Sequence, residues 1–191
     1  MRRTAYLLVP ILALGCVAMA ADAPADQPPT TAPYTPLNKV LAYHDGRSKG
    51  KRSIGGSGQM IEFTMPDGYT TLVSVSVLCA RYGSTEAPDA DAALTILDEG
   101  HTTTLFTLTI PGRAFVRGAE RWVTMKFPNP PRVTDKFWVC VDFHSEQTSG
   151  VYVCYDTNTG GRYSMVGSPT VEPKPVDFKG DWMIQAMVSR K

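Results

Sequence analysis

Hydrophobic and polar residues alternate with a period of two along most of this chain. In the first long example, Val73, Val75 and Val77 fall on one side of an extended backbone, and Ser74 and Ser76 fall on the other. This pattern is typical of a β-strand with one buried face. The same alternation recurs in segments 60–65, 93–97, 103–110, 121–127, 137–143, 151–156 and 182–188.

Residues that favour turns separate these segments. Combinations of Pro, Asp, Asn and Gly at the segment ends supply the backbone conformations that tight turns need. They occur at 66–68, 98–100, 111–112, 128–131 and 158–161. About nine short strands with regularly spaced turns, and no segment of helical period, indicate an all-β fold. We predict an antiparallel two-sheet β-sandwich that is jelly-roll-like.

The N-terminus has the pattern of an export signal. Arg2 and Arg3 precede an apolar run, and Ala18 and Ala20 have the small-x-small spacing after which signal peptidase cleaves. We therefore predict a signal peptide at residues 1–20 and an exported protein, either secreted or periplasmic. The apolar run is too short for a transmembrane helix.

Lipidation at Cys16 is the alternative to plain secretion. The segment 12–16 resembles a lipoprotein box, in which the cysteine carries the lipid and becomes the new N-terminus. The match is weaker than that of the cleavage site, because Ala13 stands where such boxes usually carry leucine.

The mature chain is predicted to consist of a spacer and one domain. Residues 21–36 are rich in Ala, Pro, Thr and Asp and have little to bury, so we expect a flexible spacer. Residues 37–191 are long enough for one β-sandwich domain. Removing residues 1–20 takes away two basic and no acidic residues, which changes the formal charge from +1 to −1. This balance does not indicate binding to nucleic acid or to an anionic membrane.

Two of the alternating segments, 137–143 and 151–156, are predicted to pair as a hairpin. If Phe143 faces Val151 across the connecting loop, Cys140 lies directly opposite Cys154. Directly opposed strand residues fall within the separation that a disulfide tolerates. Cys140 and Cys154 are therefore the candidate disulfide, with two unlinked thiols as the alternative.

A third cysteine remains after signal removal. Because an odd number of thiols leaves one unpaired, Cys79 is predicted to be free and buried on the apolar face of its strand.

The second face of the predicted hairpin mixes aromatic rings with carboxylates. Trp138, Asp142, Tyr152 and Asp156 all fall on it. Rings stack on sugars, and carboxylates accept hydrogen bonds from sugar hydroxyls. These four are the candidate ligand-binding residues of a non-catalytic extracytoplasmic module, whose partner would be a glycan or a cell-envelope protein. Sheet packing would equally account for the rings, and turn chemistry would equally account for Asp156.

Sequence patterns of catalytic sites are mostly missing, and no catalytic residue is predicted. His44, His101 and His144 fall in separate turns without the spacing of zinc ligands. No cofactor or metal site is predicted, and nothing in the sequence indicates an oligomeric state. The alternative function is a small jelly-roll hydrolase or lyase with a pocket assembled from distant strands.

A set of short segments carries a resemblance that spans most of the domain. They are GKRSIGGSG at 50–58, RYG at 81–83, RG at 117–118, WV at 122–123, FWV at 137–139, TSGVYV at 148–153, YDT at 155–157 and GDWMI at 180–184. Together they resemble a family of bacterial exported β-sandwich accessory modules. The resemblance implies an accessory or interaction domain and names no catalytic residue. Cys140 and Cys154 depart from it, because small or apolar residues are expected at both positions.

Overall fold

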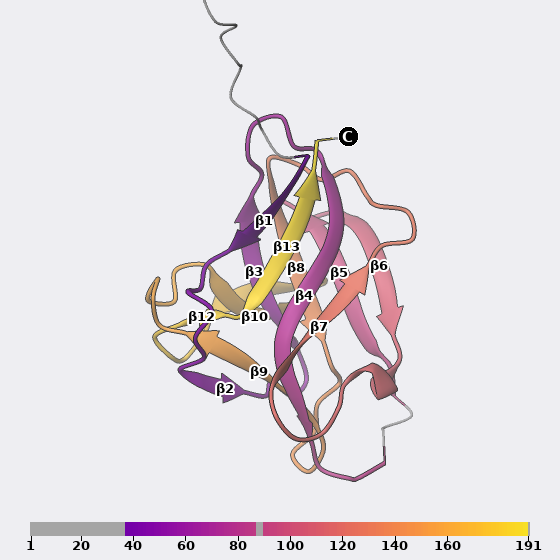
Figure 1. Ribbon diagram of the computed structural model, residues 1–191, viewed down its shortest axis with the longest axis vertical. Helices are drawn as coiled ribbons and strands as arrows, with labels where there is room; N and C mark the ends of the chain where they lie inside the picture. Colours follow the sequence, from indigo (N-terminus) through magenta and orange to yellow (C-terminus); the bar gives the residue numbers. More distant parts are fainter. Residues whose placement is uncertain (1–36, 87–89, 191) are drawn as a thin grey trace, which may run out of the picture. The chain divides into compact units, whose positions relative to one another are not determined.

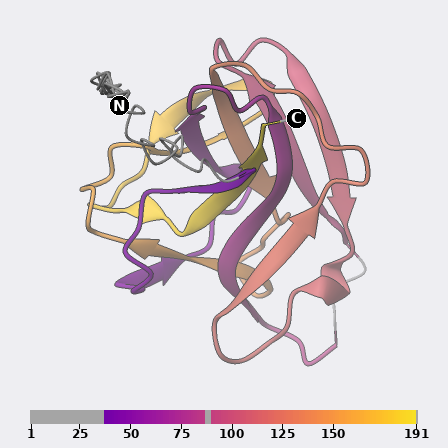
Figure 2. The same cartoon turned by 45° about the horizontal axis from the view of Figure 1, so that its top comes forward.

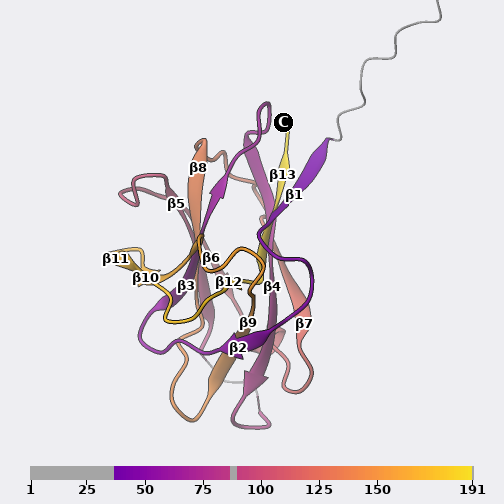
Figure 3. The same ribbon diagram turned by 90° about the vertical axis from the view of Figure 1, so that its left-hand side faces the viewer.

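The computed structural model describes residues 37–86 and 90–190, and these residues form two antiparallel β-sheets. The sheets pack face to face, as Figure 1 and the edge-on view of Figure 3 show. This confirms the predicted all-β two-sheet sandwich. The predicted signal peptide at 1–20, the spacer at 21–36 and Cys16 lie outside the described residues.

One sheet has seven strands. Its main order is β1-β13-β4-β9-β12, with β7 paired to β4 and β2 paired to β9. Figure 2 shows β4, in purple and magenta, between β7 and β13. The strands are β1 (Asn38–Ala42), β2 (Gly50–Arg52), β4 (Thr71–Tyr82), β7 (Arg121–Lys126), β9 (Gly150–Asp156), β12 (Asp181–Trp182) and β13 (Ile184–Ser189).

The other sheet has six strands in the order β11-β10-β3-β8-β5-β6. They are β3 (Gly58–Thr64), β5 (Ala92–Asp98), β6 (Thr104–Ile110), β8 (Lys136–Asp142), β10 (Ser164–Ser168) and β11 (Val171–Pro175). A 3-10 turn, η1 (Gly112–Ala114), leads from β6 to β7. The chain passes from one sheet to the other between most consecutive strands, as in jelly-roll-like sandwiches. Within the described residues, no helix has the length and apolar character needed to cross a membrane.

The core lies between the two sheets and consists of the apolar residues that alternation places inward. The largest buried side chain is that of Trp182, which is 0% exposed. Its Nε1 donates a hydrogen bond to the Met165 carbonyl oxygen at 3.0 Å, so the one polar atom of the indole is satisfied inside the core. The alternating residues of β8 and β9, together with Phe143 just after β8, also face this core, as predicted: Phe137, Val139, Val141, Phe143, Val151 and Val153.

A β-bulge changes the alternation at the start of β4. Ser74 is the register partner of Met187 and Leu72 that of Val188, so Val73 has no partner on β13. As a result Leu72 is fully buried while Val73 is only partly buried. The prediction that Val73 shares the buried face of Val75 is therefore wrong, because a bulge adds one residue to one strand.

Candidate functional site

The predicted hairpin of 137–143 with 151–156 is wrong. β8 pairs with β3 and β5 in the six-stranded sheet, whereas β9 pairs with β2, β4 and β12 in the seven-stranded sheet. The apolar residues of both segments meet across the core instead of lying along a shared edge. Trp138 and Asp142 therefore alternate onto the outer face of one sheet, and Tyr152 and Asp156 onto the outer face of the other.

Trp138 packs on a small apolar cluster on the outer face of the six-stranded sheet. Its half-buried ring covers Met60, Leu97 and Cys140. Its Nε1 donates a hydrogen bond to the Glu99 carbonyl oxygen at 3.3 Å. These contacts favour sheet packing as the role of this ring.

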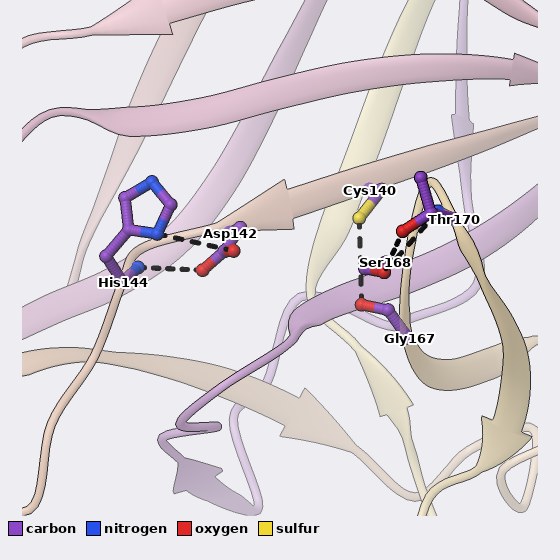
Figure 4. Close-up of polar contacts among 6 residues, drawn as sticks. All are labelled: Cys140, Asp142, His144, Gly167, Ser168 and Thr170. Atoms are coloured by element: carbon purple, nitrogen blue, oxygen red, sulfur yellow. Dashed lines mark hydrogen bonds and ion pairs between the residues drawn. The ribbon is translucent and has the colours of Figure 1, made fainter.

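The two candidate carboxylates both accept hydrogen bonds from nearby backbone. Asp142 accepts from the His144 N–H at 2.8 Å, and its other oxygen lies 3.4 Å from His144 Nδ1 (Figure 4). Asp156 is 1% exposed and accepts from the N–H groups of Asp45 at 2.7 Å and Asn158 at 3.2 Å. The contact with Asn158 is turn chemistry at the end of β9, whereas the contact with Asp45 ties this end to the segment after β1.

The predicted disulfide is also wrong, because Cys140 and Cys154 are free and lie on the outer faces of different sheets. The Cys140 thiol donates to the Gly167 carbonyl oxygen at 4.0 Å (Figure 4). Burial raises the pKa of Cys140 to about 12 and also raises the pKa of Cys154. Cys79 is buried and free, as predicted, and burial raises its pKa to about 12.

A pocket of about 450 Å³ lies beside Tyr152, next to the β8–β9 connection. Three strands and two connecting segments contribute to it, and they are far apart in the sequence. The lining residues are Lys51, Arg52, Ser53, Gly55, Tyr82, Ser145, Glu146, Gln147 and Tyr152.

Two glycines allow close approaches beside this pocket, one between β2 and β9 and one between β9 and the β8–β9 connection. Gly50 of β2 pairs with Tyr155 of β9, and a Cβ at Gly50 would overlap the Tyr155 ring. A Cβ at Gly150 would overlap Ser145 and would lie 2.8 Å from the Tyr82 hydroxyl. A larger residue at either position would therefore displace β2 or the β8–β9 connection.

Tyr82 and Tyr152 form an aromatic pair on the outer face of the seven-stranded sheet. Their ring centroids are 4.3 Å apart, and the ring planes make an angle of 30°. The Tyr82 hydroxyl donates to the Glu146 carbonyl oxygen at 2.5 Å and lies 3.0 Å from Ser53 Oγ. Lys51 Nζ lies 5.5 Å from the centroid of the Tyr152 ring. These contacts hold both rings in place before a ligand arrives.

The two cations of the pocket differ in their surroundings. Lys51 Nζ forms an exposed ion pair with Glu120 Oε1 at 2.6 Å. This contact raises the pKa of Lys51 and lowers that of Glu120. Arg52 is exposed, and among the described residues no carboxylate lies within 4.0 Å of its guanidinium. Its hydrogen-bond donors are therefore available to a ligand.

The alternation pattern pointed to Tyr152 as a site residue but not to Tyr82, Lys51 or Arg52. Two signals in the sequence could have found them. Tyr82 continues the alternation of its strand onto the outer face, and residues 47–52 contain four basic residues in six positions.

Within the described residues, no group of three or more His, Cys, Asp or Glu side chains is arranged to hold a metal ion. Comparisons of the chain with protein-family models, curated proteins and solved structures found no match.

Proposed function

We propose that the domain is a non-catalytic binding module and that it binds carbohydrate in the pocket beside Tyr82 and Tyr152. The observation that carries this proposal is the fixed aromatic pair next to polar and cationic groups. An aromatic face packs against the apolar face of a sugar ring, while neighbouring polar groups bind its hydroxyls. The pocket volume of about 450 Å³ falls within the range of about 300–1,000 Å³ that is typical of small-molecule sites.

The polar groups of the pocket suit a ligand rich in hydroxyls. The side-chain amide of Gln147 and the hydroxyl of Ser53 both donate and accept hydrogen bonds. Arg52 supplies donors only. The predicted export and the resemblance to exported accessory modules remain predictions, and both are compatible with a glycan or a cell-envelope protein as the partner.

Binding to a panel of neutral and acidic polysaccharides tests the proposal, with affinity gel electrophoresis as the assay. Tyr152→Ala should weaken retention by about tenfold or more, because burying one large aromatic side chain contributes about 1.5–3 kcal/mol. Trp122→Ala is the matched control, since Trp122 is 38% exposed on a strand of the same sheet and does not line the pocket. It should leave retention unchanged.

A second control separates binding from folding. Trp138→Ala should lower the thermal midpoint of unfolding, because it uncovers the Met60 cluster, and should leave retention intact. The proposal is overturned if the wild type ignores every polysaccharide, or if Tyr152→Ala binds as well as the wild type. Release of reducing sugar from a bound polysaccharide would instead support the hydrolase or lyase alternative.

A further inference from the structure

A short basic segment runs beside the pocket. Residues 47–52 contain Arg47, Lys49, Lys51 and Arg52, and all four are exposed. The segment ends in β2, which pairs with β9 at the edge of the seven-stranded sheet, as Figure 1 and Figure 2 show. The Lys49 N–H also donates to the Tyr155 carbonyl oxygen at 2.9 Å, which fixes the backbone of the segment before β2.

The positive charge of this segment is only partly balanced. Lys51 pairs with Glu120. Among the described residues, no carboxylate lies within 4.0 Å of the charged groups of Arg47, Lys49 or Arg52. One further carboxylate at the pocket belongs to Glu146. Asp45 is also exposed, and its Oδ1 accepts a hydrogen bond from the Arg47 N–H at 2.8 Å. Four cations therefore face three carboxylates on this part of the surface.

We propose that the ligand of the pocket is an acidic polysaccharide, a chain of sugars that carry carboxylate or sulfate groups. This inference rests on the proposed function and adds the ligand class. Tyr82 and Tyr152 pack against a sugar ring. Lys51 and Arg52 bind the acidic group of that sugar, and Arg52 presents the planar fork that matches carboxylate and sulfate oxygens.

The remaining cations extend the site beyond the pocket. Arg47 and Lys49 precede the pocket residues in the same segment, so a polymer that leaves the pocket along β2 meets a second set of positive charges. Because all four side chains are exposed, their attraction for the polymer is screened by salt. A neutral polysaccharide gains nothing from these charges and shows no such salt dependence.

The test compares three polysaccharide probes: polygalacturonate, which carries carboxylates, heparin, which carries mainly sulfates, and dextran, which is neutral. Affinities are measured by calorimetry at about 50 mM and about 300 mM NaCl, which span a large change in screening length. The wild type should bind at least one acidic probe about tenfold more tightly than dextran, with weaker binding at high salt. The better acidic probe identifies the anionic group.

The variant Arg47→Gln/Lys49→Gln removes two exposed charges that do not line the pocket and should weaken binding to that acidic probe by about tenfold, since each exposed charge contact contributes a few-fold. It should leave binding to dextran unchanged. Lys126→Gln/Lys174→Gln removes the same charge from exposed positions elsewhere and should change neither affinity.

The outcomes separate this inference from the proposed function. Equal affinity for acidic and neutral probes, with Tyr152→Ala weakening both, would overturn the acidic ligand and keep the carbohydrate pocket. Binding to none of the probes would overturn both proposals. Double-stranded DNA serves as a further probe. If it binds as tightly as the best acidic polysaccharide and Tyr152→Ala does not weaken that binding, the inference is overturned, because the segment would then attract any polyanion.

Discussion

The buried carboxylate of Asp181 anchors the loop between β9 and β10. Its removal tests how much burial increases the contribution of a hydrogen bond to the free energy of unfolding. Asp181 is 0% exposed. Its oxygens accept hydrogen bonds from Thr159 Oγ1 and from the N–H groups of Gly161 at 3.1 Å, Arg162 at 3.1 Å and Tyr163 at 2.8 Å. We expect Asp181→Ala to lower the free energy of unfolding by several kcal/mol.

The magnitude follows from the donors that the variant leaves without a partner. A hydrogen bond to a charged group contributes about 1.5–3 kcal/mol, but water can reach part of this loop. With about 1–2 kcal/mol for each of three backbone donors, the loss is about 3–6 kcal/mol. That is a large share of the 5–15 kcal/mol or so by which domains are typically stable.

Urea unfolding followed by tryptophan fluorescence measures the loss, and Asp98→Ala is the matched control. Asp98 accepts three hydrogen bonds, one fewer than Asp181, from Thr102 N at 2.8 Å, Thr102 Oγ1 at 3.0 Å and Thr103 N at 2.9 Å. Its turn is exposed, so water replaces the lost acceptor and the loss should be much smaller. Equal losses for the two variants would refute the reasoning, because burial of the carboxylate would then add nothing to the strength of its hydrogen bonds.

Three further predictions concern buried polar groups. Gln59 is 0% exposed, and within the described residues neither amide atom has a hydrogen-bond partner. Gln59→Met should therefore raise the free energy of unfolding by about 1–2 kcal/mol in urea titrations, and a decrease would contradict this. Burial raises the pKa of Cys79 and Cys140 to about 12. Both thiols should therefore resist a disulfide reagent at about pH 8 until urea unfolds the protein, and fast reaction of either thiol in the folded protein would contradict this prediction. Burial lowers the pKa of His44 below 6.5, so the unfolded chain binds more protons and stability falls as the pH drops below 6.5. His44→Leu should flatten this part of the pH profile, and parallel profiles of the two proteins would argue against it.

Alternation predicted the strands that have a full apolar face and missed the short strands, which place at most one or two side chains against the core. β4 and β8 each place apolar residues on the core and therefore show a clear period of two. β10 and β11 are short, lie at one edge of the six-stranded sheet and lack a clear alternation. β11 also contains Pro173 and Pro175, which edge strands tolerate and which weaken a strand prediction.

The prediction of a hairpin between 137–143 and 151–156 was wrong for a different reason. Alternation indicates which side of a strand is buried, but it does not indicate which strand lies beside it. A seven-residue connection from 143 to 149 can close a hairpin or cross from one sheet to the other, and both leave Val141 and Val153 in the core. Every inference that used lateral pairing of β8 and β9, including the Cys140–Cys154 disulfide, failed with it.

The candidate pocket could not be predicted from the sequence, because its residues come from three strands that no local motif connects. Arg52, Tyr82 and Tyr152 belong to β2, β4 and β9, and only the register of these strands brings them together. Inward aromatic residues of a sandwich pack in the core, whereas an outward one either covers a small outer cluster, as Trp138 does, or borders a candidate pocket. Tyr82 and Tyr152 both point outward from their strands. The register that sets Ala80 opposite Tyr152 brings these two tyrosines together on one surface. In a sandwich of this type, outward aromatic residues together with a basic run such as 47–52 are therefore a better guide to a candidate site than any single segment.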